Sequence, residues 1–148
     1  MSRASDFQLL DNQNNAVKSN KDYFLSLANP SLEGDVLSFQ YSLLLHATAD
    51  HKALKVMCEF IDGILYLKYN HKFLYINDDG EIALMDEVPK THERLRLVVS
   101  DKDSTFLISR WDRNNVAELE WIKCAYGQIK INERYEGNFG MKLILNPV

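Results

Sequence analysis

Residues 110–115, with the sequence RWDRNN, combine the side-chain types that a carbohydrate site requires. Trp111 offers a flat apolar surface to the C–H face of a sugar ring, while Asp112, Asn114 and Asn115 offer oxygen and amide groups to its hydroxyls. The alternative interpretation is a strand that ends in a hairpin turn, with Trp111 covering the end of a barrel. Trp111, Asp112, Asn114 and Asn115 therefore form the first candidate ligand site.

A second group of aromatic and polar residues follows the apolar run ILYLKY at residues 64–69. An aromatic ring next to amide and imidazole groups could bind a sugar in the same way. The alternative interpretation is again a hairpin turn, because asparagine between two apolar runs is typical of tight turns. The candidate ligand-binding residues of this group are Tyr69, Asn70, His71 and Tyr75.

Sequence motifs of catalysis are absent from the chain, including G-x-S-x-G, the P-loop, G-x-G-x-x-G and H-E-x-x-H. His46 and His51 lie five positions apart, but no cysteine or carboxylate pattern completes a metal site around them. Cys58 and Cys124 stand in apolar runs, which predicts buried thiols, although a single bridge between them stays open. We predict no enzyme activity, no catalytic residue, no metal site and no cofactor.

Short apolar runs separated by Asn, Asp, Gly and Pro predict a chain built from strands and turns. The clearest stretch is a meander at residues 62–85, in which Asp62-Gly63 and Asn77–Gly80 have the composition of tight turns. Residues 36–45 and 53–61 are also predicted as strands. The spacing of apolar residues in 53–61 fits a helix equally well, so period alone leaves that alternative open.

A weak internal repeat relates distant parts of the chain. DGILYL at 62–67 resembles DSTFLI at 103–108, and GEIAL at 80–84 resembles GQIKI at 127–131. Three units of roughly 40–50 residues, each with about four strands, would fit such a repeat. Because one unit cannot bury its own apolar face, we expect the three units to close a barrel and form a single domain over residues 1–148.

The internal repeat and the sequence of residues 62–82 resemble the β-trefoil superfamily. DGILYL at 62–67, followed by HKFL at 71–74 and DGEI at 79–82, is similar to the sequence pattern of fascin-like, growth-factor-like and amaranthin-type trefoils. The order of VKSNKDYFL at 17–25, GDVLSF at 34–39 and residues 62–73 resembles the amaranthin-type agglutinin domain in particular. This resemblance implies an all-β fold, a β-trefoil.

The function expected from this reasoning is non-catalytic binding. The leading hypothesis is a lectin that holds a carbohydrate at loop ends through the aromatic and polar residues named above, and weak individual sites would favour a homo-oligomer. The second hypothesis is a trefoil that binds a protein partner, as a cytoskeletal, signalling or inhibitor-like module, through loops such as 29–35 or 135–140.

Charge and hydropathy narrow the remaining classes of partner. The formal net charge is −4 and the basic residues are scattered, which argues against nucleic acid as a partner. No run approaches the roughly 18 apolar residues of a membrane span. The first residues, MSRASDFQLLDNQ, lack the apolar stretch of a signal peptide, so we expect a cytoplasmic protein, with unconventional secretion left open.

Overall fold

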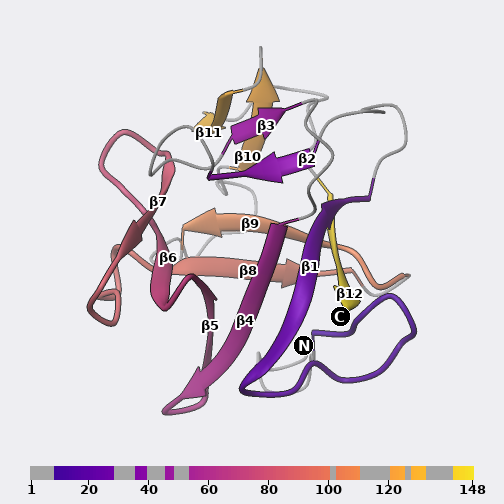
Figure 1. Cartoon of the computed structure of the whole chain (residues 1–148). Coiled ribbons are helices and arrows are strands. Elements are labelled where there is room, and N and C mark those ends of the chain that lie inside the picture. The colour runs from indigo at the N-terminus through magenta and orange to yellow at the C-terminus, as the bar shows by residue number, and fades with distance from the viewer. Residues whose placement is uncertain are drawn as a thin grey trace, which may run out of the picture.

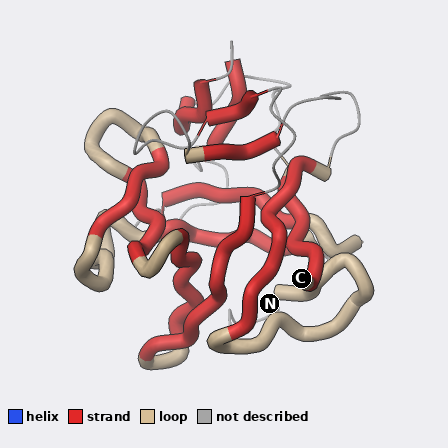
Figure 2. The backbone as a smooth tube through the Cα atoms, viewed as in Figure 1, coloured by secondary structure: helices blue, strands red, loops and turns tan. Residues whose placement is uncertain are grey.

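The computed structural model describes residues 9–28, 36–39, 46–48, 54–100, 103–110, 121–125, 128–132 and 142–148. Every regular element of these residues is a strand (Figure 2). The strands, labelled in Figure 1, are β1 (Lys21–Leu27), β2 (Val36–Ser38), β3 (His46–Thr48), β4 (Leu54–Ile61), β5 (Ile64–Tyr69), β6 (Lys72–Ile76), β7 (Ile82–Met85), β8 (Leu95–Val99), β9 (Phe106–Arg110), β10 (Trp121–Ala125), β11 (Gln128–Asn132) and β12 (Leu143–Pro147).

Two sheets contain these strands. The larger is antiparallel and has the order β7-β6-β5-β4-β1-β12-β9-β8, and the smaller has the order β10-β11-β3-β2. Strand β1 lies inside the larger sheet, with Leu25 opposite Leu54 of β4 on one side and opposite Leu145 of β12 on the other. The first and the last of the described strands therefore lie side by side within one sheet, and Figure 1 shows β1 beside β12.

The β4–β7 meander confirms the strands predicted at residues 64–85, and turn chemistry explains its tight connections. Asp62 and Gly63 have φ values of 51° and 80°, and Asn70 and His71 have values of 51° and 68°. Two consecutive residues with positive φ form the turn whose twist matches that of the adjoining strands. Strand β4 also resolves the ambiguity at residues 53–61, because Leu54–Ile61 pairs with both β1 and β5 as a strand.

The β6–β7 connection depends on Asn77. Its side-chain Oδ1 accepts hydrogen bonds from the backbone amides of Asp79 at 3.0 Å and Glu81 at 2.9 Å. Gly80 completes the turn with a φ of 80°. The side chain of Asn77 thus takes the place of a backbone acceptor, as asparagine commonly does in turns.

The core of the larger sheet is formed by one set of alternating residues from each strand. Leu54, Val56 and Cys58 of β4 point into it and are at most 4% exposed. The centre also holds large side chains that are less than 2% exposed, which include Tyr23, Leu25, Leu67, Leu74, Ile82, Phe106 and Ile108. This period of two is the pattern expected of strands with one face on an apolar core.

A loop at residues 9–17 packs beside β12. Leu9 and Val17 place buried side chains in the core, and the amide of Asn12 donates to the carbonyl of Leu145 at 2.9 Å. Asp11 is only 2% exposed, and its Oδ1 accepts the amides of Gln13 and Asn15 within the loop. The loop therefore supplies hydrogen-bond partners along an edge where β12 and β9 register a single pair among the described residues, Leu143 with Phe106.

The expectation of a β-trefoil, with three four-stranded repeats closing a barrel, is corrected by the strand order. Among the residues that the structure describes, β7 and β8 stand at opposite ends of the larger sheet and do not pair with each other. The larger sheet is therefore open. The physical reason is that β7 pairs with β6 and β8 pairs with β9, so each of these two strands keeps one edge that no described strand pairs with. The all-β class itself is correct.

Within the described ranges, no helix is long and apolar enough to cross a membrane.

Replacing His71 with glycine should stabilise the fold by about 1 kcal/mol, because glycine adopts positive φ without the steric cost that a side chain incurs. His71 is exposed and has a φ of 68°, so the substitution removes strain and buries nothing new. Urea unfolding at pH 7 checks this prediction. His92→Gly is the matched control, since His92 is exposed but is not among the described residues with positive φ, and it should be slightly destabilising. Equal effects of the two changes would contradict the strain argument.

Candidate functional site

The two groups of candidate residues from the sequence differ in what the structure describes. Trp111, Asp112, Asn114 and Asn115 lie outside the described residues, so their placement stays a prediction. Tyr69, Asn70, His71 and Tyr75 are described and belong to the β5–β6 hairpin.

The β5–β6 hairpin does not bring its aromatic candidates together. Tyr69 points to the core side, where its ring centroid lies 5.1 Å from that of Phe39. Tyr75 pairs with Ala83 and has the opposite parity to the core residues Leu74 and Ile76, so it lies on the other face of the sheet. Asn70 and His71 form the exposed turn. The four residues therefore do not converge on one ligand.

A different set of side chains does converge, on the face of β4–β7 that points away from the core. Directly paired residues share a face, so the register Met57↔Lys68, Lys68↔Phe73 and Phe73↔Met85 places one row across four strands. A second row contains Glu59 opposite Tyr66 and Tyr75 opposite Ala83. We call this set the outer face; it consists of Met57, Glu59, Tyr66, Lys68, Phe73, Tyr75, Ala83 and Met85.

Aromatic contacts and one ion pair organise the outer face. Tyr66 and Phe73 are each 6% exposed and meet edge to face with ring centroids 5.6 Å apart. The Lys68 ammonium lies 4.8 Å from the Phe73 ring centroid and 3.5 Å from a carboxylate oxygen of Glu59. The lysine is thus held by an aromatic ring and by an opposite charge at once. Met57, Tyr75 and Met85 are half-buried around this centre.

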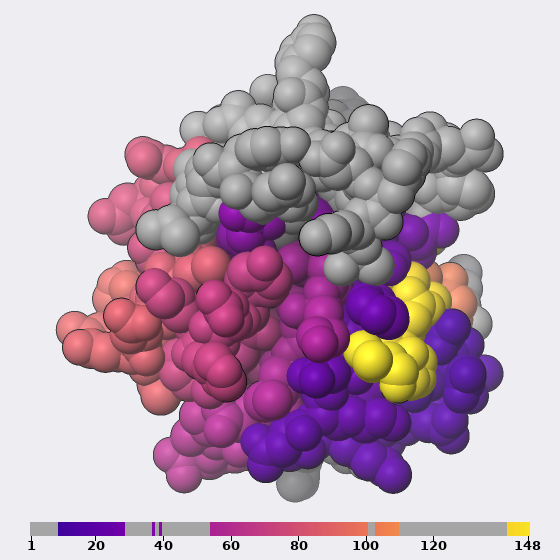
Figure 3. All heavy atoms as spheres, viewed as in Figure 1, coloured from indigo at the N-terminus to yellow at the C-terminus, as the bar shows by residue number. Residues whose placement is uncertain are grey.

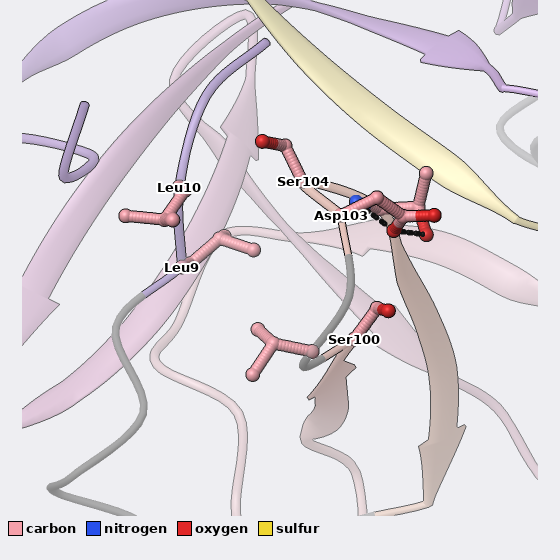
Figure 4. Close-up of a pocket in the computed structure, with 7 residues that line it drawn as sticks. Leu9, Leu10, Ser100, Asp103 and Ser104 are labelled. Atoms are coloured by element: carbon pink, nitrogen blue, oxygen red, sulfur yellow. Dashed lines mark hydrogen bonds between the residues drawn. The ribbon is translucent and has the colours of Figure 1, made fainter. Parts of the chain in front are cut away.

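A small polar hollow lies on another part of the molecule, between the 9–17 loop and the β8–β9 hairpin (Figure 4). Its lining includes Leu9, Val99, Ser100 and Asp103, and its volume of about 20 Å³ leaves room for about one water molecule. Hydrogen bonds from the hydroxyl and then the amide of Thr105 lower the pKa of Asp103. These bonds close a turn, and the hollow is too small for an organic ligand.

Cys58 has none of the properties of a reactive thiol. Its side chain is a free thiol and is completely buried in the core. Burial raises its pKa from 9.0 to about 12, so the nucleophilic thiolate is absent near neutral pH. The prediction of a buried free thiol is confirmed for Cys58. Over the described ranges, no group of three or more His, Cys, Asp or Glu side chains could hold a metal ion.

No protein-family model and no curated protein matches this chain. Solved structures do match. One is described as "type II water soluble Chl binding proteins"; it is 12% identical, has a TM-score of 0.64, and the match covers 96% of this chain and 99% of that one. Another is the water-soluble chlorophyll protein from Brassica oleracea var. Botrytis with chlorophyll b, at 12% identity and a TM-score of 0.61, covering 95% and 98% of the two chains. At this identity the likeness shows the fold alone.

These matches correct the resemblance to β-trefoil domains of the amaranthin-type agglutinin and fascin-like kind. The two solved structures named above, which cover 96% and 95% of this chain, are chlorophyll-binding proteins, and neither is an agglutinin or a fascin-like domain. The physical reason for the error is visible at Asp62-Gly63 and Asn70-His71. Their positive φ values belong to turns that antiparallel meanders share widely, so the matching residues identify hairpins and not a family.

The functions inferred from that resemblance are corrected with it. The lectin hypothesis combined the family resemblance with the side-chain types of the two candidate groups, and its alternative, a trefoil that binds a protein partner, depended on the resemblance, whereas the matched structures bind a pigment. The outer face could not be recognised as a cluster of neighbouring residues, because its members come from four different strands. The signal was present: a two-residue turn at Asn70-His71 puts Lys68 opposite Phe73, and alternation then adds Tyr66 and Tyr75 to the same face.

Proposed function

We propose that this protein binds a flat, largely apolar pigment of the chlorophyll class and does not catalyse a reaction. The observation that carries the proposal is the match to chlorophyll-binding proteins over 96% of this chain and 99% of theirs, at a TM-score of 0.64. A match of this extent is not limited to one common hairpin. Fold alone does not fix function, so the chemistry of the surface must also suit the ligand.

The described surface suits a flat ring better than a compact substrate. Ligand pockets usually enclose about 300–1,000 Å³. The hollow beside Asp103 has a volume of about 20 Å³, so it cannot enclose a tetrapyrrole. The outer face, in contrast, spans four strands, and the half-buried side chains of Met57, Tyr75 and Met85 lie on it beside the buried rings of Tyr66 and Phe73. Such a surface can contact a flat ring on one side and leaves the other side for a further copy of the chain, so a homo-oligomer remains part of the proposal.

The absence of catalysis and the cytoplasmic location also belong to this proposal. Cys58, the one cysteine whose side chain is described, is an inert buried thiol, which is consistent with both.

Mixing the purified protein with chlorophyll b at low detergent concentration should give a complex in which pigment and protein elute together from a sizing column. The visible absorption bands of the pigment should shift, because its environment changes from detergent to protein. The mass of the complex, measured by light scattering, would give the number of chains. The control is the same protein unfolded in urea, which should elute without pigment. Equal pigment in both samples, or none in either, would reject chlorophyll binding.

A further inference from the structure

Two aspartate–glycine pairs lie in the turns of the β4–β7 meander, Asp62-Gly63 and Asp79-Gly80. Such a pair can cyclise, because the backbone nitrogen of the glycine is within reach of the carboxyl carbon of the aspartate and glycine has no side chain to obstruct it. Gly63 and Gly80 both have a φ of 80°. Sequence and glycine conformation are therefore alike in the two turns, and the surroundings decide which pair reacts.

The surroundings of Asp79-Gly80 oppose the reaction. The Gly80 amide donates to the carbonyl oxygen of Asn77 at 3.0 Å, and Gly80 is buried. Asn77 Oδ1 accepts the amide of Asp79 at 3.0 Å and that of Glu81 at 2.9 Å. The glycine nitrogen can reach the carboxyl group only after part of this network opens, and each bond adds to the free energy of opening.

The surroundings of Asp62-Gly63 do not restrain the glycine in this way. Asp62 and Gly63 are both exposed, and no heavy atom beyond the chain neighbours lies within 4 Å of the position that a Cβ on Gly63 would take. Within the described ranges, the Gly63 amide donates no backbone hydrogen bond of the kind that Gly80 makes. Figure 1 and Figure 3 place the β4–β5 connection at the lower edge of the molecule. Exposed tips of this kind open readily.

We propose that Asp62 is a site of spontaneous conversion to isoaspartate, and that the hydrogen bonds of Asn77 protect Asp79 from the same reaction. The Gly63 nitrogen bonds to the carboxyl carbon of Asp62, and one carboxyl oxygen leaves as water with the protons of the amide and of the acid. The product is a five-membered succinimide ring. Water then opens the ring: attack at the side-chain carbonyl restores aspartate, and attack at the main-chain carbonyl gives isoaspartate.

The conversion changes the β4–β5 hairpin without changing the mass of the chain. Isoaspartate adds one methylene to the main chain between Ile61 and Ile64, which pair directly across the turn. Because a two-residue turn fixes the register of its strands, the lengthened turn should weaken the adjoining pairs, including Phe60 with Leu65. This modification does not involve the pigment, so it stands apart from the proposed function.

The first test follows both sites in the full chain during storage at physiological temperature and pH. Fragmentation of its peptides by electron transfer distinguishes isoaspartate from aspartate at the same mass. Asp62 should convert about tenfold or more faster than Asp79, because only Asp79 must first break hydrogen bonds. The control is the same chain unfolded in urea, in which the two rates should become similar. Equal rates in the folded protein, or faster conversion of Asp79, would overturn the proposal.

The second test removes the protection at Asn77. Asn77→Ala lacks the side-chain oxygen that accepts the amides of Asp79 and Glu81, so conversion of Asp79 should rise about threefold or more while that of Asp62 stays the same. Asn77→Asp keeps an acceptor oxygen and is the matched control, which should leave Asp79 protected. An unchanged rate at Asp79 in folded Asn77→Ala would refute the protection. If Asn77→Ala does not fold, the comparison of the two sites in the unmodified protein still decides the proposal.

Discussion

Replacing Phe106 with alanine should lower the free energy of unfolding by about 3–5 kcal/mol. Phe106 is 1% exposed and stands at a junction of three strands, opposite Val99 of β8 and opposite Leu143 of β12. Loss of the ring removes its buried surface and leaves a cavity where β12 and β9 register their one described pair. The neighbouring strands cannot collapse into that space without breaking the pair, which places the cost at the upper end of the range.

Urea unfolding followed by circular dichroism measures this effect. The matched control is Leu107→Ala, the next residue along β9, which points to the other face and is half-buried. Its cost should be less than half that of Phe106→Ala. Comparable costs for the two substitutions would mean that the core does not lie on the side of β9 described here.

Raising the pH from 9 to 11 should destabilise the protein by about 2–3 kcal/mol more than it destabilises Cys58→Ala, at about 1.4 kcal/mol for each pH unit. Burial raises the pKa of Cys58 from 9.0 to about 12 in the folded state. Below pH 9 the thiol is protonated whether the chain is folded or unfolded. Between pH 9 and 12 the unfolded chain releases this proton while the folded chain retains it, so rising pH favours unfolding.

The difference between the two proteins isolates this effect, because their lysines and tyrosines titrate alike. Cys58→Ala also leaves a small cavity, which lowers stability by a similar amount at every pH. Unfolding in guanidinium at pH 7, 9, 10 and 11 therefore should give two curves that converge as the pH rises. Parallel curves would show that the Cys58 thiol titrates normally, and thus that it is not buried as described.

Local chemistry explains which parts of the fold could be predicted from the sequence. The bounds of β5 follow from Asp62-Gly63 on one side and Asn70-His71 on the other, because two-residue turns fix both the end of a strand and its register. Sheet closure could not be predicted in this way. Whether β8 pairs with a distant strand depends on the geometry of the whole sheet, and no residue near Leu95–Val99 encodes it.

In the candidate site, too, local turns could be predicted from the sequence and the pairing of more distant strands could not. Tyr69 and Tyr75 are close in sequence, which suggested a common site. Tyr69 pairs with Lys72 and shares its face of the sheet, whereas Tyr75 lies three residues after Lys72 on the same strand and therefore points to the opposite face. The pairing of Lys68 with Phe73 could have been derived from the same turn, and with it part of the outer face. The contribution of Met57 required the β4 register as well. The function could not be derived, since the turn residues that suggested a lectin family are common to many meanders.

The central position of β1 has a consequence for how the chain is made. Residues 21–27 leave the ribosome early, and the β4–β7 meander can add to one of their edges as it emerges. The other edge of β1 must wait for residues 143–147 before β12 can pair with it. Until residues 143–147 are made, that edge presents unpaired amide and carbonyl groups, which is the condition under which strands associate with the wrong chain. The sheet therefore reaches its final order only when its last strand arrives between two strands made long before.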